Sequence, residues 1–404
     1  MRPLRVLHVT PYSADAWAYG GIPRLADALA RGLVRRGHDV TVCTTDVCDE
    51  SRRLPREPPR GRFEAWPDAR TRDGVTMRVF PNVSNRLAYH WQLFLPIGLD
   101  EYLRRSAGAF DVAHLHACRN LPGVIAARHL RRAGVPYVLA PNGTALRIER
   151  RRFAKRIFDA ALGTRVVRHA SRVIAVSDAE RAQLGTIGVE SHAIRVVPNP
   201  IDLAEFSPAP ERGTFRRRLG GPDAPLVLYL GRLSARKRID VLVRAFAQVR
   251  ESTARLVIAG NDMGAAQRAR RLARELGVEG RTVYTGLLRE GERLEALADA
   301  DVLVYPSQDE IFGLVPLEAL ICGTPVIVAG DSGCAEVVRA SGGGHIVPVG
   351  DARALARAID HVLDHPARWR AAAAEAAGRV RAAYGADVVC AQMDAVYREL
   401  VTAA

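Results

Sequence analysis

Short apolar runs alternate with longer amphipathic stretches along the whole chain. In the first half, six runs have the length and composition of buried strands, at residues 5–10, 39–45, 111–116, 136–141, 172–177 and 194–199. Five more follow in the second half, at residues 225–231, 255–261, 282–286, 301–307 and 324–330. Strands that alternate with helical stretches are typical of parallel sheets with crossover helices. The pattern therefore predicts an α/β fold with a parallel sheet in each half.

The strand pattern restarts at Leu226, directly after a Pro-rich stretch, SPAPERGTFRRRLGGPDAP. We therefore predict a first Rossmann-like domain at residues 1–205, a linker at 206–225 and a second domain at 226–385. A closing helix is predicted at residues 386–404. The chain has 404 residues and 48% of them are hydrophobic, which is enough for two domains that each bury a core.

No segment has the pattern of a signal peptide or of a bilayer-spanning helix. No run approaches the roughly 18 apolar residues that a transmembrane helix needs, and the opening MRPLRVLHVTPY has the pattern of a first strand. The six cysteines include no C-x-x-C pair and no metal-like spacing to histidine. We therefore expect a cytoplasmic protein with reduced, mostly buried thiols and no structural metal.

A formal charge of +14 is a reason to consider nucleic acid as a partner. Only Lys155 and Lys237 are lysines among the 58 basic residues, which indicates a compositional bias toward arginine. Neither an RNA-binding aromatic signature nor a helix-turn-helix pattern accompanies the charge, so nucleic acid is not a predicted partner.

Half of the net charge comes from one segment, 147–172, which begins at Arg147 and ends at Arg172. It has nine basic residues against two acidic ones, a net of +7. The segment predicts an amphipathic helix with apolar residues near one face. Such a helix either lies on an anionic membrane surface or packs its apolar stripe on the first domain, and both interpretations remain open.

The stretch PSQDEIFGLVPLEALICGTP places Glu310 and Glu318 around Gly313, which is predicted to open a helix after a buried strand. The unpaired backbone N–H groups at Gly313, Leu314 and Val315 favour a diphosphate. Eight helical residues span roughly 12 Å, so one carboxylate can bind sugar hydroxyls while the other binds ribose hydroxyls. The spacing therefore suits a nucleotide-activated sugar. For either glutamate alone, an ordinary amphipathic helix is the simpler interpretation.

Two further loops carry groups suited to phosphate. In GRLSARK, Arg232 and Lys237 follow a strand and can neutralise charge on a leaving diphosphate. Gly20 and Gly21 follow the first strand, where an open parallel sheet binds ligands. The glycines do not form a G-x-G-x-x-G pattern, which disfavours a dinucleotide redox enzyme. Each loop taken alone is also consistent with a generic turn or a solvated surface.

Other polar residues near strand ends are weaker candidates. His114 and His116 alternate on one face of their strand, and a zinc site would need further ligands. Asp299 and Asp301 form a D-x-D sequence next to a strand start, and we interpret them as helix-end and loop residues.

The order and spacing of these segments resemble those of the family 4 glycosyltransferases. The signature of that family is Glu, seven residues, Glu, followed by a small-residue turn and a Pro-Val strand, which here is EIFGLVPLE and then CGTPVIV. The resemblance also covers VLHVTPYSADAWAYGGIPR, DVAHLHA, AVSDAERAQL, VPNPID and LYLGRLSARKRIDVLVRAF. It implies a GT-B fold, in which two Rossmann-like domains face each other across a cleft and the closing helix crosses back to the first domain.

The resemblance also implies roles for individual residues. His116 and Glu310 are the expected catalytic residues on either side of the donor sugar, and Glu318 holds the ribose. The donor diphosphate is expected to bind Gly20, Gly21, Arg232, Lys237, Gly313, Leu314 and Val315. Gly333 and Cys334 are expected near the sugar, and Tyr12, Tyr19 and Arg24 are expected to face the acceptor. The chain has Arg238 where the family usually has glycine.

The predicted function is a retaining glycosyltransferase. It moves a hexosyl group from a nucleoside diphosphate sugar, with UDP or GDP favoured, to an acceptor hydroxyl in cell-envelope polysaccharide or glycolipid synthesis. Neither a metal nor another cofactor is expected. If the basic segment binds membrane, we expect the acceptor to be lipid-linked and to lie at the inner face of the cytoplasmic membrane. The alternatives are a nucleotide-sugar epimerase of the same fold and a non-catalytic sugar-nucleotide sensor.

Overall fold

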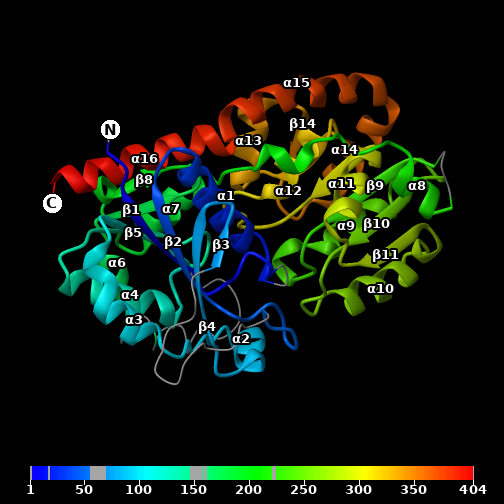
Figure 1. The fold of residues 1–404 in the computed structure, drawn as a ribbon. Coiled ribbons are helices and arrows are strands. Elements are labelled where there is room, and N and C mark those ends of the chain that lie inside the picture. Colours follow the sequence, from blue (N-terminus) through cyan, green and yellow to red (C-terminus); the bar gives the residue numbers. More distant parts are fainter. Residues whose placement is uncertain are drawn as a thin grey trace. The chain divides into compact units, whose positions relative to one another are not determined.

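The computed structural model describes residues 2–16, 19–54, 70–145, 158, 162–220 and 224–403 (Figure 1). The chain divides into two compact units, Met1–Ile201 with Ala386–Ala404, and Asp202–Gly385. Every strand predicted from the apolar runs is present, and each unit contains one sheet. The predicted α/β class with two Rossmann-like domains is therefore correct. Among the described residues, no helix combines the length and the apolar character that crossing a membrane requires.

The first unit contains an eight-stranded sheet in the order β3-β4-β2-β1-β5-β6-β7-β8. All neighbours are parallel except β3 and β4, an antiparallel hairpin that the apolar pattern did not predict. Its turn is Asp73-Gly74, with φ of 49° and 80°, a dipeptide that favours two-residue hairpin turns. The strands are β1 (Arg5–Val9), β2 (Asp39–Thr45), β3 (Arg70–Arg72), β4 (Val75–Phe80), β5 (Val112–His116), β6 (Tyr137–Ala140), β7 (Arg172–Ala175) and β8 (Ile194–Val196).

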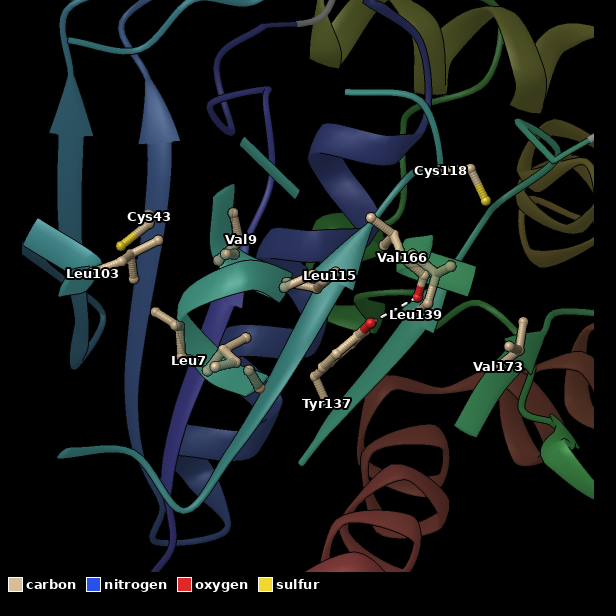
Figure 2. Close-up of a cluster of buried hydrophobic side chains, with 14 of the residues drawn as sticks. Leu7, Val9, Cys43, Leu103, Leu115, Cys118, Tyr137, Leu139, Val166 and Val173 are labelled. Atoms are coloured by element: carbon tan, nitrogen blue, oxygen red, sulfur yellow. Dashed lines mark hydrogen bonds between the residues drawn. The ribbon is translucent and has the colours of Figure 1, made fainter. Parts of the chain in front are cut away.

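Side chains of this sheet alternate between two apolar cores because successive residues of a strand point to opposite faces. Along β1, Val6 belongs to one core, whereas Leu7 and Val9 belong to the other. Figure 2 shows the second of these cores, in which the Tyr137 hydroxyl donates to the Val166 carbonyl at 2.7 Å. The helices of the unit are α1 (Ile22–Arg35), α2 (Asn85–Trp91), α3 (Leu99–Ser106), α4 (Leu121–Arg132), α6 (Thr164–Arg168), α7 (Asp178–Thr186) and α16 (Ala386–Ala403), with short 3-10 turns η2 (Ala107–Ala109) and η4 (Ser191–Ala193).

The last helix, α16, packs on α1 and completes the first unit. The two helices approach so closely that a Cβ on Gly32 would lie 2.2 Å from the Cys390 sulfur. Asp394 of α16 accepts a hydrogen bond from Arg36 at 3.2 Å and lies 3.1 Å from the His38 imidazole. Apolar packing and these polar contacts together hold the C-terminal end of the chain on the first unit.

The second unit contains a six-stranded, all-parallel sheet in the order β11-β10-β9-β12-β13-β14. Its strands are β9 (Leu226–Leu230), β10 (Arg255–Ala259), β11 (Thr282–Gly286), β12 (Val302–Tyr305), β13 (Val326–Ala329) and β14 (Gly344–Val347). The edge strand β14 was not predicted, because glycines and a histidine interrupt its apolar pattern. The helices are α8 (Thr214–Arg218), α9 (Ile239–Phe246), α10 (Ala266–Glu275), α11 (Glu290–Asp299), α12 (Leu314–Ile321), α13 (Gly333–Ser341), α14 (Ala352–Asp364) and α15 (Pro366–Tyr384), with 3-10 turns η5 (Leu203–Phe206), η6 (Ala235–Lys237) and η7 (Glu279–Arg281).

The segment 206–225 is part of the second unit, which corrects its prediction as a linker. It contains α8, and α8 packs on α11. Asp299 accepts hydrogen bonds from the backbone N–H groups of Gly213 and Arg216, the latter at 3.0 Å. The Arg216 guanidinium in turn binds Asp301 at 2.5 Å. The two aspartates of the D-x-D sequence therefore hold α8 in place, as residues of a helix end and of the loop after it.

Candidate active site

The predicted donor loops of the second unit meet where its strand order reverses. From β9 the chain proceeds through β10 to β11 at one edge, and β12 then returns to the other side of β9. Ligands of open α/β sheets bind beyond the carboxyl ends of the strands at such a point. The loop after β9 carries Lys237, and the loop after β12 carries Glu310.

Lys237 and Glu310 form an ion pair between these two loops. The Lys237 ammonium donates to Glu310 and also to the Tyr305 hydroxyl, at 2.6 Å from its oxygen. Ser307 donates to the same Glu310 oxygen at 3.0 Å. Burial by itself raises the pKa of Glu310, but Lys237, together with Arg236 and Ser307, more than offsets this effect and the pKa falls to about 2. Glu310 is therefore an anion at every physiological pH and does not act as a proton donor.

Two buried tyrosines support this ion pair, and the sequence interpretation missed both. The Tyr229 and Tyr305 rings stack with centroids 6.0 Å apart, and the Lys237 ammonium lies 4.6 Å from the centre of the Tyr305 ring. Burial, together with the charge of Glu310, raises the pKa of Tyr305, so its hydroxyl stays neutral. Tyr229 donates to the carbonyl of Arg232 at 2.9 Å. In the sequence, the only signal for a role of these two tyrosines was their position near the ends of apolar strands.

The loop between β9 and α9 has a shape that explains the unusual residue at Arg238. Arg238 has a φ of 50°, a left-handed conformation that glycine adopts most easily. Its guanidinium contacts Asp240 at 3.3 Å and Gln308 at 3.2 Å. These contacts stabilise the strained backbone in place of a glycine. The neighbouring predicted site residue Arg232 has an exposed side chain on the same loop.

Helix α12 begins directly after Gly313, which has a φ of 73° and provides no side-chain cap. A Cβ on Gly313 would lie 2.2 Å from the Cys334 sulfur, and one on Gly333 would lie 1.9 Å from the Ile311 carbonyl oxygen. The two glycines are therefore needed for the β12 loop to pack on the start of α13, a reason beyond the predicted approach of a ligand. Cys334 is buried, which raises the pKa of its thiol and keeps it neutral. Leu314 and Val315 of the first turn are half-buried.

Glu318 projects from α12 and is only 1% exposed. Its carboxylate accepts a hydrogen bond from Arg293 of α11. The other end of the same guanidinium binds Glu205 of η5 at 3.0 Å. Arg293 thus links the predicted ribose carboxylate to the segment that opens the second unit. Sequence reasoning missed Arg293 because one arginine gives no signal in a chain this rich in arginine.

The first unit brings together the predicted histidines at the carboxyl end of β5. The rings of His114 and His116 stack at 4.3 Å with an angle of 10°, as the alternation of the strand predicts. His116 lies 3.2 Å from His8 of β1, measured between Nε2 and Nδ1. Burial lowers the pKa of His116 to about 3, so its imidazole is neutral. His116 can therefore exchange hydrogen bonds with a ligand but does not provide a positive charge.

The structure shows how two of the expected acceptor residues are packed. Tyr12 and Tyr19 are buried, and their rings pack on each other at 5.1 Å and on Phe94. The Tyr12 hydroxyl donates to Gln92 at 3.1 Å. Aromatic packing draws both side chains into the core of the first unit, so they do not face solvent. Arg24, in the first turn of α1, is half-exposed.

The predicted glycine pair lies among the residues that the structure describes, whereas much of the basic segment does not. Gly20 has a φ of 96°, and the exposed Gly21 directly precedes the first turn of α1. The backbone at this position therefore has the left-handed conformation that favours glycine.

In the basic segment, residues 147–157 and 159–161 lie outside the described residues. Among the residues that the structure does describe, no group of three His, Cys, Asp or Glu side chains is arranged to hold a metal ion.

Comparison with known proteins decides the family. Residues 19–205 match the Glycosyltransferase Family 4 model, and residues 211–379 match the model of Glycosyl transferases group 1. A D-inositol 3-phosphate glycosyltransferase of Kineococcus radiotolerans is 31% identical over 97% of this chain and 92% of its own length. The chain is a family 4 glycosyltransferase. A second protein of the same name, from Acidothermus cellulolyticus, is 33% identical over 85% of this chain and 78% of its own length.

The fold of this family 4 glycosyltransferase is also found in a solved structure. Anabaena Alr3699/HepE in complex with UDP-glucose matches with a TM-score of 0.73 at 19% identity, over 98% of this chain and 100% of that chain. This likeness confirms the predicted GT-B fold class. In the glycosyltransferase described here, the second unit thus presents an anionic carboxylate, a lysine and an uncapped helix start at one sheet edge.

Proposed function

We propose that this glycosyltransferase transfers a hexosyl group from a nucleoside diphosphate sugar, with retention of configuration, to an acceptor hydroxyl. The ion pair of Lys237 and Glu310 at the strand-order reversal carries the proposal, because it holds a cation for a diphosphate and an anion for sugar hydroxyls side by side. UDP-sugars and GDP-sugars are the favoured donors. The UDP-glucose complex of the Anabaena protein supports a UDP-sugar.

In this proposal the donor rearranges the ion pair. The diphosphate attracts the Lys237 ammonium, with Arg232 and the start of α12 as further positive groups. Release of Lys237 leaves the Glu310 carboxylate to accept hydrogen bonds from sugar hydroxyls. Glu318 holds the ribose, and His116 binds the opposite edge of the sugar. Lys237 thus supports Glu310 before binding and stabilises the leaving group during transfer.

Retention follows from a front-face displacement in this proposal. In this proposal the Glu310 carboxylate accepts hydrogen bonds from sugar hydroxyls and so positions the sugar, and no covalent intermediate with the enzyme forms. The acceptor oxygen bonds to the anomeric carbon as the bond to the diphosphate breaks, and the departing phosphate oxygen takes the acceptor proton. The cations of the loop after β9 and the helix start supply the charge, so we propose that neither a metal nor an organic cofactor takes part.

Two acceptor classes follow from different observations. The sequence resemblance favours a glycan or a lipid-linked acceptor of cell-envelope synthesis. The names of the two curated relatives favour D-inositol 3-phosphate. Attachment to the inner face of the cytoplasmic membrane through the segment 147–172, and with it a cytoplasmic location, stays a prediction of the sequence.

The donor site is tested by saturation-transfer NMR with UDP-, GDP-, ADP- and dTDP-sugars, on the wild type and on Glu318→Ala and Lys237→Ala. We expect one donor to bind the wild type and to lose its signal in both variants. Addition of D-inositol 3-phosphate or of a lipid-linked glycan is then expected to release the nucleoside diphosphate. A changed sugar nucleotide without an acceptor would identify an epimerase instead, and binding without turnover would identify a sensor. If no donor binds the folded wild type, the proposed donor site is wrong.

Arg293→Met is expected to weaken donor binding about tenfold, which is about 1.4 kcal/mol, with a smaller effect on the rate at saturating donor. The substitution removes the guanidinium that orients the Glu318 carboxylate. Isothermal titration with the donor measures the change. Arg268→Met is the matched control, because Arg268 is an exposed arginine of α10. Equal dissociation constants for the wild type and Arg293→Met would show that Glu318 needs no support from α11.

A further inference from the structure

Three buried histidines and one tyrosine form a continuous hydrogen-bonded chain in the first unit. His114 Nδ1 lies 2.6 Å from the hydroxyl oxygen of Tyr397, a residue of α16. The same hydroxyl lies 3.5 Å from His8 Nε2, and His8 Nδ1 lies 3.2 Å from His116 Nε2. All four residues are at most 1% exposed. The chain therefore connects β1, β5 and the last helix without involving solvent.

Each of the three contacts needs one proton, and this requirement couples the tautomers. If Tyr397 donates to His114 Nδ1, then His8 donates to Tyr397 from Nε2 and His116 donates to His8 from Nε2. All three imidazoles then carry the proton on Nε2. If His114 donates from Nδ1 instead, every proton shifts to the other side of its contact, and all three carry the proton on Nδ1. A neutral imidazole has one donor and one acceptor nitrogen, so these are the two arrangements in which every contact has one proton and the buried Tyr397 hydroxyl donates its own proton within the chain.

Two imidazole nitrogens remain outside this chain. His114 Nε2 and His116 Nδ1 are buried and have no hydrogen-bond partner among the described residues. Both histidines line a cavity of about 20 Å³, together with Asn142 and Asn199 from loops at the carboxyl edge of the sheet. This volume accommodates one water molecule or one hydroxyl group. In either arrangement of the chain, one of the two nitrogens is a donor and the other is an acceptor.

We propose that His114 and His116 together bind a single hydroxyl-sized group in this cavity, and that Tyr397 and His8 set which histidine donates and which accepts. A hydroxyl both donates and accepts one hydrogen bond, so it matches the pair in both arrangements. Tyr397 and His8 are positioning residues, since they act on the bound group only through the two histidines. The bound group is either a water molecule or a hydroxyl of the substrate.

Burial keeps the system neutral, which the coupling requires. The pKa of His8 and that of His114 are lowered well below the usual value by burial and by the neighbouring imidazoles, and burial alone lowers that of His116. A protonated imidazole would donate from both nitrogens and would break the alternation along the chain. The coupling is a property of the free protein. Only its consequence for sugar binding rests on the proposed function.

The tautomers are measured by two-bond ¹H–¹⁵N correlation NMR at pH 7.5 on the full chain labelled with ¹⁵N-histidine, with signals assigned from His8→Gln, His114→Gln and His116→Gln. We expect His8, His114 and His116 to be neutral and to share one tautomer. Tyr397→Phe removes the central hydroxyl and is expected to change the tautomer population of His114, while His8 and His116 still share theirs. Tyr137→Phe is the matched control, because it removes another buried tyrosine hydrogen bond of the same unit, 2.7 Å long.

Different tautomers for His114 and His116 in the wild type would overturn the proposal, as would a His114 signal that Tyr397→Phe and Tyr137→Phe change equally. Titration with a nucleotide sugar then distinguishes the two sources of the bound group. A substrate hydroxyl shifts His114 and His116 with the sugar nucleotide but not with the nucleoside diphosphate, whereas a bound water leaves both signals unchanged. If the donor fails to bind at all, the shared tautomer of the free protein still tests the coupling, so the two failures are distinguishable.

Discussion

Lys237→Met is expected to lower the transfer rate about a hundredfold or more and to destabilise the second unit by about 3 kcal/mol. Both losses have one origin. The ammonium is the cation next to the proposed diphosphate, and it is also the partner of the Glu310 carboxylate, whose side chain is only 13% exposed. Removing it leaves a carboxylate whose burial is then compensated only by Ser307, Tyr305 and more distant charges. Steady-state kinetics and urea unfolding measure the two effects.

A second substitution separates these effects. In Lys237→Met with Glu310→Gln, the buried charge is gone, so the free energy of unfolding is expected to recover most of its loss, while the activity does not recover. Arg244→Met, at an exposed position of α9, is the control and is expected to leave both quantities unchanged. If the double variant regains activity along with stability, the ion pair is structural and Lys237 has no role at the diphosphate. An active Lys237→Met enzyme would lead to the same conclusion.

The sequence predicts the groups at this site better than it predicts their partners. Apolar runs followed by glycine and polar residues locate the loops after β9 and β12, because parallel strands end at one sheet edge. The contact between Lys237 and Glu310 joins residues 73 positions apart, and no local pattern reports it. Tyr305 and Arg293 were missed for a related reason. Their roles depend on what lies beside them in space, whereas their residue types are common at such positions.

In the fold, too, the sequence predicts some elements and misses others. Strands buried on both faces are long apolar runs and were all predicted, whereas the hairpin of β3 with β4 and the edge strand β14 are partly exposed and carry mixed residues. The Pro-rich segment before β9 was interpreted as a linker because its composition is typical of loops. Asp299 and Asp301 instead hold it on α11 through Arg216. Tyr12 and Tyr19 are expected to face the acceptor from the resemblance alone, and no sequence pattern reports that their rings pack on each other.

The first unit is expected to lose stability when the pH falls from 7.5 to 5. His8, His114 and His116 are held neutral by burial, which lowers the pKa of each in the folded state. The unfolded chain therefore takes up protons first, near its ordinary value of about 6.5, and at pH 5 each histidine costs about 2 kcal/mol. Glu180 acts in the opposite direction. Burial raises its pKa to about 7, so the folded state takes up that proton first and regains about 2 kcal/mol.

The net loss from these four groups is therefore about 4 kcal/mol, a large part of the 5–15 kcal/mol that typically stabilises a domain. Hydrogen exchange at the amides of β1 and β5, corrected for intrinsic rates, measures it in the first unit alone. In His8→Gln, the free energy of unfolding of the first unit is expected to depend less steeply on pH, by about 1.4 kcal/mol per pH unit between pH 6 and 5. His192→Gln, at an exposed histidine, is expected to keep the wild-type slope. If stability rises toward pH 5, or if both variants share one slope, the buried histidines take up protons in the folded state and the neutral chain from His8 to Tyr397 does not exist.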